Sequence, residues 1–494
     1  MSSISTSNVT SGFIDLATFD EIEKYLYGGP DATAYFVRET RKATWFTQVP
    51  VVLSRASGSP AFNQEWSVSI SRSGDYLLQT WMRLQTPAVS LNSGNQYGSS
   101  GSIRWCKNLM HNIIRECAIT FNDLVAARFD SFHLDFWAAF TVPAGKRNGY
   151  ANMIGTTDEL TAPHNATGEF GPTLPSLTLN LPLPFFYGRN SGIALPTAAL
   201  PYNDMRINFS FRNWTELLIL ENTTIPTPNV DSRVTPNVPT DITNTPTLGY
   251  CQVWANYAIV SNDERKRMAC APRDILIEQV QTAPRQTFVP SQNSAPSFDI
   301  RFSHAIKVLF FSVRNNTCPA EWSNYTCASP ITKQTMNEES PSGAVDPIIQ
   351  ASLIYENSQR LSQMGSDYFS LVNPFFHAPA IPLETGYHMY SYSLDFISLD
   401  PMASTNFGKL TNVSMVPEAS DGAKVASLGT GVVGSGADFK QTFEFIVTAV
   451  NNNIIRVSGG ALGYMFLTWV MVALTIFQNL KIGEAKNRWL PLKM

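Results

Sequence analysis

Apolar and polar residues alternate in short runs along most of the chain, with the two-residue period of a β-strand that buries one face. Residues 66–71 (WSVSIS) and 206–213 (RINFSFRN) show the alternation, and residues 443–450 (FEFIVTAV) repeat it. Residues 307–313 (KVLFFSV) are almost continuously apolar, which is typical of a strand buried on both faces. The pattern therefore predicts many strands in both halves of the chain.

Few stretches show a helical pattern. Asp20 precedes apolar residues at helical spacing and Gly28–Pro30 ends the run, which predicts a short helix. Residues 134–140 form a second helical patch, and long Gly-, Asn- and Ser-rich loops such as residues 90–102 join the strands. Many strands, long polar loops and few helices favour an all-β sandwich or jelly roll.

A change in composition divides the chain. Residues 221–249 hold five prolines and eight threonines but only four charged residues, which indicates a connector or an exposed loop. A chain of 494 residues is also too long for one ordinary core. The predicted parts are an N-terminal arm (1–30), a first β-domain (31–220), the Pro/Thr-rich connector or loop (221–250), a second β-domain (251–457) and a hydrophobic tail (458–494).

The tail contains an unusually long uncharged stretch. Residues 457–480 carry no charge, and fourteen of the seventeen residues in Ala461–Phe477 are apolar. A membrane-spanning helix needs about 20 such residues. A buried C-terminal helix or strand pair explains the same pattern, so both interpretations stay open.

Charge and cysteine content narrow the possible functions. Only 15% of residues are charged, the net charge is −4, and no basic block occurs. A protein that coats nucleic acid needs many Lys and Arg residues to neutralise phosphates, so direct nucleic-acid binding is not expected. The six cysteines form no CxxC pair, and the N-terminus has no secretory signal pattern.

No recognisable catalytic or ligand-binding motif is present. Residues 429–434 (GTGVVG) match GxGxxG but lack the strand and helix that a dinucleotide site needs, and so indicate a flexible glycine loop. The two histidines nearest in sequence lie eleven residues apart. The six histidines are His111, His133, His164, His304, His377 and His388. We therefore expect no catalytic, cofactor-binding or metal-binding residues, no cofactor, and no enzymatic activity.

Two other classes of protein remain to be considered. Eight Asn-x-Ser/Thr tripeptides and the hydrophobic tail would suit a membrane-anchored surface glycoprotein with a β-sandwich ectodomain. The missing secretory signal argues against it. A jelly-roll enzyme or lectin is supported only by the expected fold, which does not fix function.

Several long motifs resemble one protein family, in the same order along the chain. They include residues 7–29, 110–123, 181–207 (LPLPFFYGRNSGIALPTAALPYNDMRI), 346–361 and 451–460. These stretches resemble the major capsid proteins of iridoviruses and other large cytoplasmic DNA viruses. The resemblance extends to about Gly463.

The resemblance implies a double jelly roll: two eight-stranded β-sandwiches side by side, with a few short helices and a hydrophobic C-terminal segment. It implies a late structural protein whose homotrimers form pseudo-hexagonal capsomers. These capsomers would tile an icosahedral shell around an internal membrane. Its expected partners are itself, neighbouring capsomers and minor capsid proteins, with no direct nucleic-acid contact. Its expected location is the virion, after assembly in the host cytoplasm.

We expect the N-terminal arm, Met1–Pro30, to reach beneath neighbouring subunits. The resemblance implies that residues 181–207 close the first roll, with Pro182 and Pro184 at a sheet edge or a strand start and residues 185–187 filling the roll. Residues 221–249 match the family poorly. Family members usually end soon after the stretch at residues 451–460. Two interpretations of the additional residues 464–494 stay open: Ala461–Phe477 anchors the subunit in the internal membrane, or the tail has no function in the capsid.

Overall fold

The computed structural model separates the chain into two units, Met1–Trp45 and Phe46–Met494, which are described separately below. The structure describes residues 2–222, 233–270, 272–290, 295–327, 345–428 and 440–464.

The first unit carries the two helices of the N-terminal arm, α1 (Ser2–Ala17) and α2 (Glu21–Tyr27). The Asp20 carboxylate accepts a hydrogen bond from the Glu21 N–H, and the Glu23 side chain accepts one from the Asp20 N–H. This capping box confirms the helix predicted after Asp20. The Ser- and Thr-rich sequence of α1 has weak helix propensity, which explains why the pattern did not predict it.

The second unit begins with two β-sheets that share one core. In spatial order, one sheet holds β1 (Phe46–Val52), β14 (Cys251–Val260), β4 (Tyr76–Gln85) and β10 (Thr178–Pro182). The other holds β2 (Ser54–Gly58), β3 (Glu65–Ser69), β11 (Met205–Phe211), β7 (Ile114–Phe121) and β8 (Leu124–Asp130). All neighbouring strands are antiparallel. Side chains from both sheets, including Met82, Val253, Ile119 and Phe209, meet in one buried cluster.

The second half repeats this arrangement. One sheet holds β15 (Arg273–Thr282), β24 (Phe443–Ser458), β18 (Ala305–Asn315) and β21 (His388–Ser391), extended by β16 (Gln286–Phe288), β22 (Thr405–Asn406) and β25 (Ala461–Tyr464). The facing sheet holds β17 (Phe298–Asp299), β23 (Val413–Ala419), β19 (Ile348–Tyr355) and β20 (Ser358–Gly365).

Both halves have the same strand order. We count the main strands of each half from first to eighth and take β3 as the second strand of the first half. Strand β2, which pairs antiparallel with β3, is an additional strand at the edge of that sheet. Each half then has one sheet ordered 1-8-3-6 and one ordered 2-7-4-5. Two four-strand layers connected in this way form a jelly roll, so the chain is a double jelly roll, as the resemblance implied. We call the halves the first and the second roll.

Smaller elements occupy the loops between these strands. The remaining strands are β5 (Val89–Ser90), β6 (Gly101–Trp105), β9 (Thr173–Leu174), β12 (Leu218–Asn222) and β13 (Arg233–Val234). The remaining helices are α3 (Leu109–Asn112), α4 (Ser131–Thr141), α5 (Ala144–Ile154), α6 (Asp158–Thr161), α7 (Asn262–Cys270), a π-helix η6 (Tyr368–Val372), α8 (Asn373–His377) and α9 (Asp421–Leu428). Single turns of 3-10 helix are η1 (Gly98–Ser100), η2 (Phe186–Gly188), η3 (Ser191–Ile193), η4 (Thr197–Ala199), η5 (Trp214–Glu216) and η7 (Phe407–Lys409).

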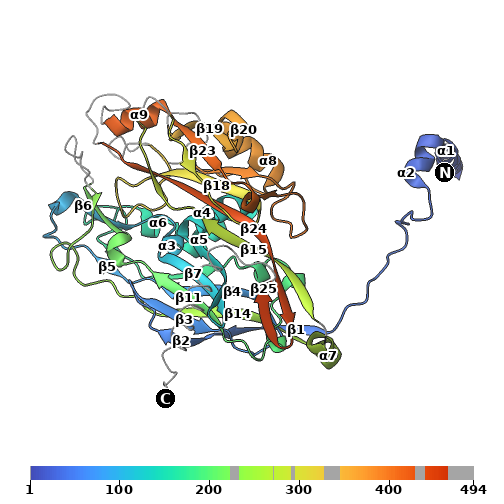
Figure 1. Cartoon of the computed structure of the whole chain (residues 1–494), viewed down its shortest axis with the longest axis horizontal. Coiled ribbons are helices and arrows are strands. Elements are labelled where there is room, and N and C mark those ends of the chain that lie inside the picture. Colours follow the sequence, from blue (N-terminus) through green and yellow to red (C-terminus); the bar gives the residue numbers. More distant parts are fainter. Residues whose placement is uncertain are drawn as a thin grey trace, which may run out of the picture. The chain divides into compact units, whose positions relative to one another are not determined.

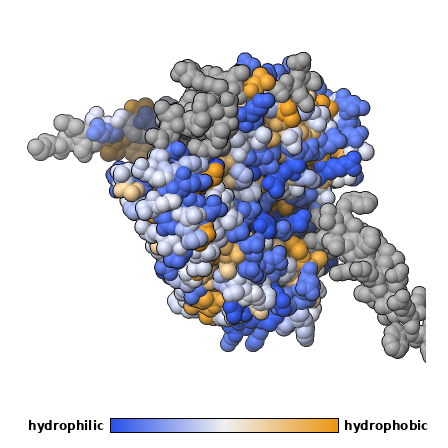
Figure 2. Space-filling view, turned by 90° about the vertical axis from the view of Figure 1, so that its left-hand side faces the viewer, coloured by the Kyte–Doolittle hydropathy of each residue, from blue (hydrophilic) through white to orange (hydrophobic). Residues whose placement is uncertain are grey.

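Helices α3, α4 and α5 lie between the strands of the two rolls, below β24 and above β11 in Figure 1. The buried cluster of the first roll also contains Ile275 and Ile455 from the second roll. The two rolls therefore share a packed junction. On the face drawn in Figure 2, hydrophobic residues form small separate areas among hydrophilic and neutral ones.

The predicted strands are confirmed where the pattern was clear. In β11 every second residue is buried, and in β18 every residue after Ala305 is buried. The helix predicted at residues 134–140 is α4. Pro182 ends the edge strand β10, and residues 185–187 are buried in the first roll as expected.

The first roll extends further along the chain than the sequence suggested. Residues 221–249 were interpreted as a connector or an exposed loop, and Cys251 as the start of the second domain. Instead, β14, which begins at Cys251, lies between β1 and β4 of the first roll. The Pro/Thr-rich stretch therefore belongs to one half of the chain: it begins at the end of β12, contains β13 and ends before β14. Residues 223–232 within it lie outside the described residues.

Two sequence interpretations fall largely outside the described residues. The glycine run at residues 429–434 lies there, as does the tail from residue 465 onward. Within the part of the chain that the structure describes, no helix is long and apolar enough to cross a membrane. The start of the hydrophobic segment, Ala461–Tyr464, is β25, a strand paired with β24.

Candidate functional site at the junction of the two rolls

Helix α4 of the first roll covers the outer face of a second-roll sheet. The Asp130 carboxylate caps the helix by accepting a hydrogen bond from the His133 N–H at 2.9 Å. The side chains of Phe132, Phe136 and Phe140 follow at four-residue intervals and thus share one side of the helix. They belong to a buried cluster with residues of β18, β21 and β24. This cluster lies on the opposite face of the sheet from the second roll's own core.

Phe310 of β18 is the centre of this contact. Its ring centroid lies 6.0 Å from that of Phe136 and 5.4 Å from that of Phe140, and both pairs are stacked. Phe396 meets the same ring edge-on at 5.9 Å. Fully buried aromatic pairs of this kind contribute large apolar area and a fixed geometry, so they hold the rolls in one orientation.

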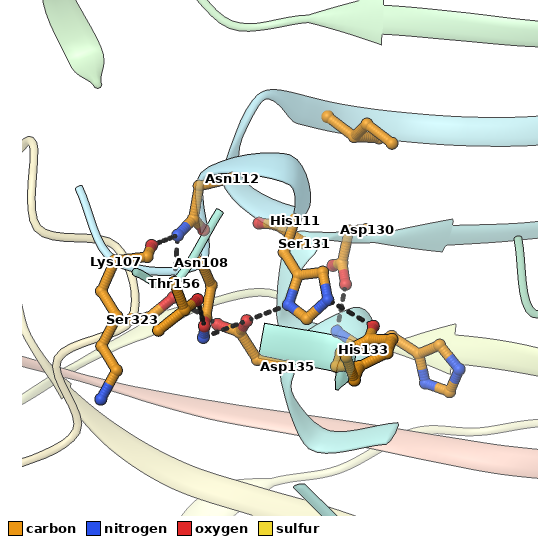
Figure 3. Close-up of polar contacts among 12 residues, drawn as sticks. Lys107, Asn108, His111, Asn112, Asp130, Ser131, His133, Asp135, Thr156 and Ser323 are labelled. Atoms are coloured by element: carbon orange, nitrogen blue, oxygen red, sulfur yellow. Dashed lines mark hydrogen bonds and ion pairs between the residues drawn. The ribbon is translucent and has the colours of Figure 1, made fainter. Parts of the chain in front are cut away.

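Asp135, on the same helix, joins the rolls through a buried carboxylate. Asn108 Nδ2 donates to Oδ1 at 3.1 Å, and His111 Nδ1 lies 2.7 Å from the same oxygen. The hydroxyl groups of Ser323 and Tyr325 donate to Oδ2 at 2.7 and 2.9 Å. Figure 3 shows Asn108 and His111 of the first roll directed at Asp135. The other two donors come from the second roll, so one carboxylate holds both.

The tyrosines around Asp135 stay protonated. Burial, and then the nearby Asp135 charge, raises the pKa of Tyr325 and of Tyr150 well above the ordinary value. The Tyr150 hydroxyl lies 2.7 Å from His111 Nε2. A protonated phenol donates a hydrogen bond, so Tyr325 remains a donor to Asp135 at neutral pH.

Two arginines, one from each roll, lie over a single tryptophan. The guanidinium carbon of Arg212 is 3.7 Å from the ring centroid of Trp322, and that of Arg314 is 4.1 Å from it. Arg212 donates to the Asn112 carbonyl at 2.6 Å, and Arg314 pairs with Glu444 at 2.6 Å. Burial, and then the like charge of Arg314, lowers the pKa of Arg212 to about 10. Arg212 is thus charged at neutral pH, and the indole face of Trp322 stabilises its charge.

A third ionic group links the rolls on the other side of α4. Glu278 of β15 pairs with Lys307 of β18 and with Arg189 of the first roll. The Arg189 guanidinium carbon also lies 4.1 Å from the ring centroid of Trp137 on α4. Burial, and then the Arg189 charge, lowers the pKa of Lys307 to about 8. The paired carboxylate and the Ser398 carbonyl, 2.6 Å away, satisfy the buried ammonium.

Another buried carboxylate, that of Glu321 in the second roll, pairs with two arginines of the first roll. These are Arg104 of β6 and Arg233 of β13, the latter at 2.5 Å. Burial alone would raise the pKa of Glu321, but the charges of Arg233 and Arg104 outweigh it and lower the pKa below the ordinary value. The junction therefore depends on several ionic contacts in addition to aromatic packing.

Two of the predicted histidines lie in separate buried environments. His133 lies among aromatic rings, and His388 is 2.9 Å from Asp346 Oδ2 within the second roll. Burial, and then the Arg189 charge, lowers the pKa of His133 to about 3, so it is neutral. Among the described residues, no group of three or more His, Cys, Asp or Glu side chains is placed to hold a metal ion.

The sequence predicted none of these junction residues. The available signals were weak: Lys307 precedes a continuous apolar run, and Asp135 interrupts the apolar sequence of α4. A charged side chain is almost never fully buried unless it is paired. A charged residue within an apolar run therefore indicates a buried ion pair or hydrogen-bond network.

Two of the Asn-x-Ser/Thr tripeptides lie in the interior. Asn315 is buried and its amide donates to the Gln441 side chain at 2.7 Å. Asn324 is buried and its side-chain oxygen accepts from Thr326. A glycan on either residue would not fit the folded chain, which argues against the glycoprotein alternative.

Comparison with protein families gives consistent matches across the chain. Residues 34–260 match the model of the major capsid protein N-terminus, and residues 264–463 match the model of the large eukaryotic DNA virus major capsid protein. The chain is 64% identical over 470 residues to the major capsid protein of Costelytra zealandica iridescent virus, which covers 94% of this chain and 100% of that protein. It is 45% identical over 469 residues to that of Frog virus 3, with the same coverage.

Solved structures show the same fold at low sequence identity. A quasi-atomic model of the PBCV-1 virus capsid aligns with a TM-score of 0.67 and 18% identity, over 88% of this chain and 100% of that chain. The Faustovirus major capsid protein aligns with a TM-score of 0.66 and 11% identity, over 89% and 94% of the two chains.

Proposed function

The chain belongs to the major capsid protein family of iridescent viruses and other large eukaryotic DNA viruses. We propose that it assembles as a homotrimeric capsomer. The family consists of structural proteins of the virion shell. The main support for the trimer is the internal repeat of the chain. The two rolls have the same strand order and are held together by a packed junction. Three such chains around a threefold axis present six rolls, and hence a six-sided outline.

Capsomers of this outline would tile an icosahedral shell around an internal membrane. Closed shells depend on many weak contacts repeated by symmetry, and a surface with few charges suits extensive protein contact. Only 15% of the residues are charged, and the chain has no basic block that would bind the genome directly. Minor capsid proteins and neighbouring capsomers are the proposed partners, and the host cytoplasm is the proposed site of assembly.

The rolls divide, in this proposal, at the loop and helix that follow β14. The first roll then spans residues 46–260 and the second residues 273–458. The strand pairing of β14 supports this division. Helix α7, which contains the charged run at residues 263–267, joins the two rolls. Arg265 of this helix pairs with Asp75 at 2.8 Å.

The two chain ends are proposed to make contacts outside the subunit. In the arm, apolar side chains including Phe13, Ile22 and Leu26 are exposed. This is the composition expected of a segment that becomes buried under a neighbouring subunit. The segment Ala461–Phe477 is proposed to contact the internal membrane. A chain ending at Gly463 should then bind vesicles more weakly than the full chain.

The mass and shape of the purified full chain test the trimer. Light scattering in a mild non-ionic detergent should give three times the chain mass of 54.6 kDa, and negative-stain images should show a six-sided outline. A monomer or dimer that persists at all concentrations would contradict the proposal, while the fold would still stand.

A further inference from the structure

We propose that an exposed apolar patch at the end of the second roll's helical segment packs on the outer face of the first roll in a second copy of the chain. This contact would repeat between subunits the junction that α4 makes within one subunit. The inference rests on the proposed trimer and names the surfaces that would hold it together. It follows from the fact that each roll has a helical segment directly after its fifth strand.

The junction within the chain provides the template. Helix α4 begins directly after the fifth strand of the first roll, β8. It lies on the outer face of the 1-8-3-6 sheet of the second roll, where Phe136 and Phe140 stack on Phe310. Phe310 belongs to β18, the third strand, and pairs with Met389 of β21 and Thr448 of β24.

The second roll has a helical segment at the equivalent place. Residues 366–377, which include η6 and α8, begin directly after its fifth strand, β20. Val372, Phe375 and Phe376 follow at spacings of three and four residues and share one face. Unlike their counterparts on α4, they are exposed: Phe375 is 68% and Phe376 is 71% accessible.

Leu394 completes this surface. It is 72% exposed, and its carbonyl oxygen lies 3.0 Å from Nδ1 of His377, the last residue of α8. We call the surface the α8 patch, formed by Val372, Phe375, Phe376 and Leu394. Neighbouring exposed apolar side chains of this size mark a contact surface, because isolated monomers seldom keep them in water.

The first roll has an uncovered face at the place where the second roll receives α4. Trp81 lies on the third strand of the 1-8-3-6 sheet and pairs with Pro182 of β10 and Trp254 of β14. Phe310 lies on the corresponding strand of the second roll and likewise pairs with the sixth and the eighth strand. Trp81 and Trp254 stack with ring centroids 6.2 Å apart and point away from the core that Met82 enters. We call this surface the Trp81 face, formed by Trp81, Trp254 and Pro182.

A mostly apolar cavity adjoins the Trp81 face. It has a volume of about 880 Å³ and lies between β4 and β10 on one side and α4 and α5 on the other. Its lining includes Trp81, Trp137, Leu183 and Phe185. A groove of this size and lining suits aromatic side chains such as Phe375 and Phe376.

Symmetry explains why the occupant should be a second copy. Within the chain, the first roll's helix covers the second roll. If the helical segment of the second roll covers the first roll of the next chain, the α8 patch of each chain contacts one neighbour and its Trp81 face contacts the other. Such a head-to-tail contact closes into a ring, and three chains with two rolls each complete six positions.

The first test removes the patch. In the full chain, Phe375→Ser with Phe376→Ser should shift the mass at a fixed protein concentration from trimer to monomer, while circular dichroism stays unchanged. The matched control is Ile349→Ser on β19, an exposed apolar residue outside the patch, which should leave the trimer intact. A trimer unchanged in the double variant would overturn the proposal, whereas a wild-type chain that is not a trimer would overturn the proposed function itself.

The second test does not depend on how the serine variant folds. The full chain carrying Phe376→Cys and Gln79→Cys, one substitution in the α8 patch and one beside Trp81, should form disulfide-linked trimers with oxidised glutathione. A chain with only one of the two substitutions, which adds one cysteine to the six native ones, should remain unlinked on a non-reducing gel. If the double variant has the mass of a trimer but forms no disulfide-linked chains, other surfaces make the trimer contact and the proposal is wrong.

Discussion

The carboxylate of Asp135 receives hydrogen bonds from four side chains, and two of these belong to each roll. Its side chain is fully buried. A buried charge is tolerable only when its hydrogen bonds are complete, so each donor depends on the others. At the scale of single residues, this group therefore contributes to the orientation of the rolls as well as to stability.

Replacing that carboxylate by an amide tests its role. Asp135→Asn keeps the shape of the side chain but replaces one carboxylate oxygen by an NH2 group. This hydrogen-bond donor then faces donor groups of one of the two rolls. We expect the free energy of unfolding to fall by about 3 kcal/mol. Urea unfolding at a fixed protein concentration measures this, with the exposed Asp400→Asn as control. Equal stability of the two variants would show that the network does not stabilise the junction.

His133 should make stability depend on pH. Its pKa is about 3 in the folded chain, because burial and then the Arg189 charge disfavour the protonated ring, against 6.5 unfolded. Below pH 6.5 the unfolded chain binds a proton that the folded chain excludes, so stability is lost as the pH falls from 6.5 toward 3. Between pH 7 and pH 5 the contribution of this residue is about 2 kcal/mol.

The variant His133→Phe should remove that part of the pH dependence. Neither ring nitrogen of His133 has a hydrogen-bond partner in the described structure, and the ring packs among Phe129, Trp137 and Phe310. The loss of stability between pH 7 and pH 5 should shrink by about 2 kcal/mol. Phe129→Leu is the control, since it should destabilise the chain equally at both pH values. An unchanged pH dependence in His133→Phe would refute the assignment.

At the scale of elements, the strands were predictable because burial on one face leaves a two-residue period. The clear alternation of β11 and the continuous apolar run of β18 follow directly from their places in the sheets. Helix α5 was missed because it has no buried face of its own along most of its length. Its position depends on contacts with β10, which no local pattern records.

The arm is an element whose role can be separated from folding. No buried cluster of the described residues contains a residue before Leu53. Deletion of Met1–Pro30 should therefore leave the thermal unfolding midpoint and the trimer unchanged, while shell assembly fails. Scanning calorimetry and electron microscopy of the assembled material measure the two effects. Normal shells without the arm would contradict its proposed role beneath neighbouring subunits.

At the scale of the whole molecule, strand order could not be read from alternation. Strand β14 follows a Pro/Thr-rich stretch that looked like a domain connector, yet it pairs with β1, about 200 residues earlier in the chain. Such pairing depends on the full layer of neighbouring strands. The double jelly roll was implied by the resemblance to a family, and the repeated 1-8-3-6 and 2-7-4-5 strand orders confirm that fold.

The most direct test of the account is a cryo-electron microscopy reconstruction of the purified full chain at side-chain resolution. We expect three chains around a threefold axis, with six rolls in alternating order and the second roll of each chain against the first roll of the next. A twofold dimer, or a threefold assembly in which rolls of the same kind meet, would contradict it.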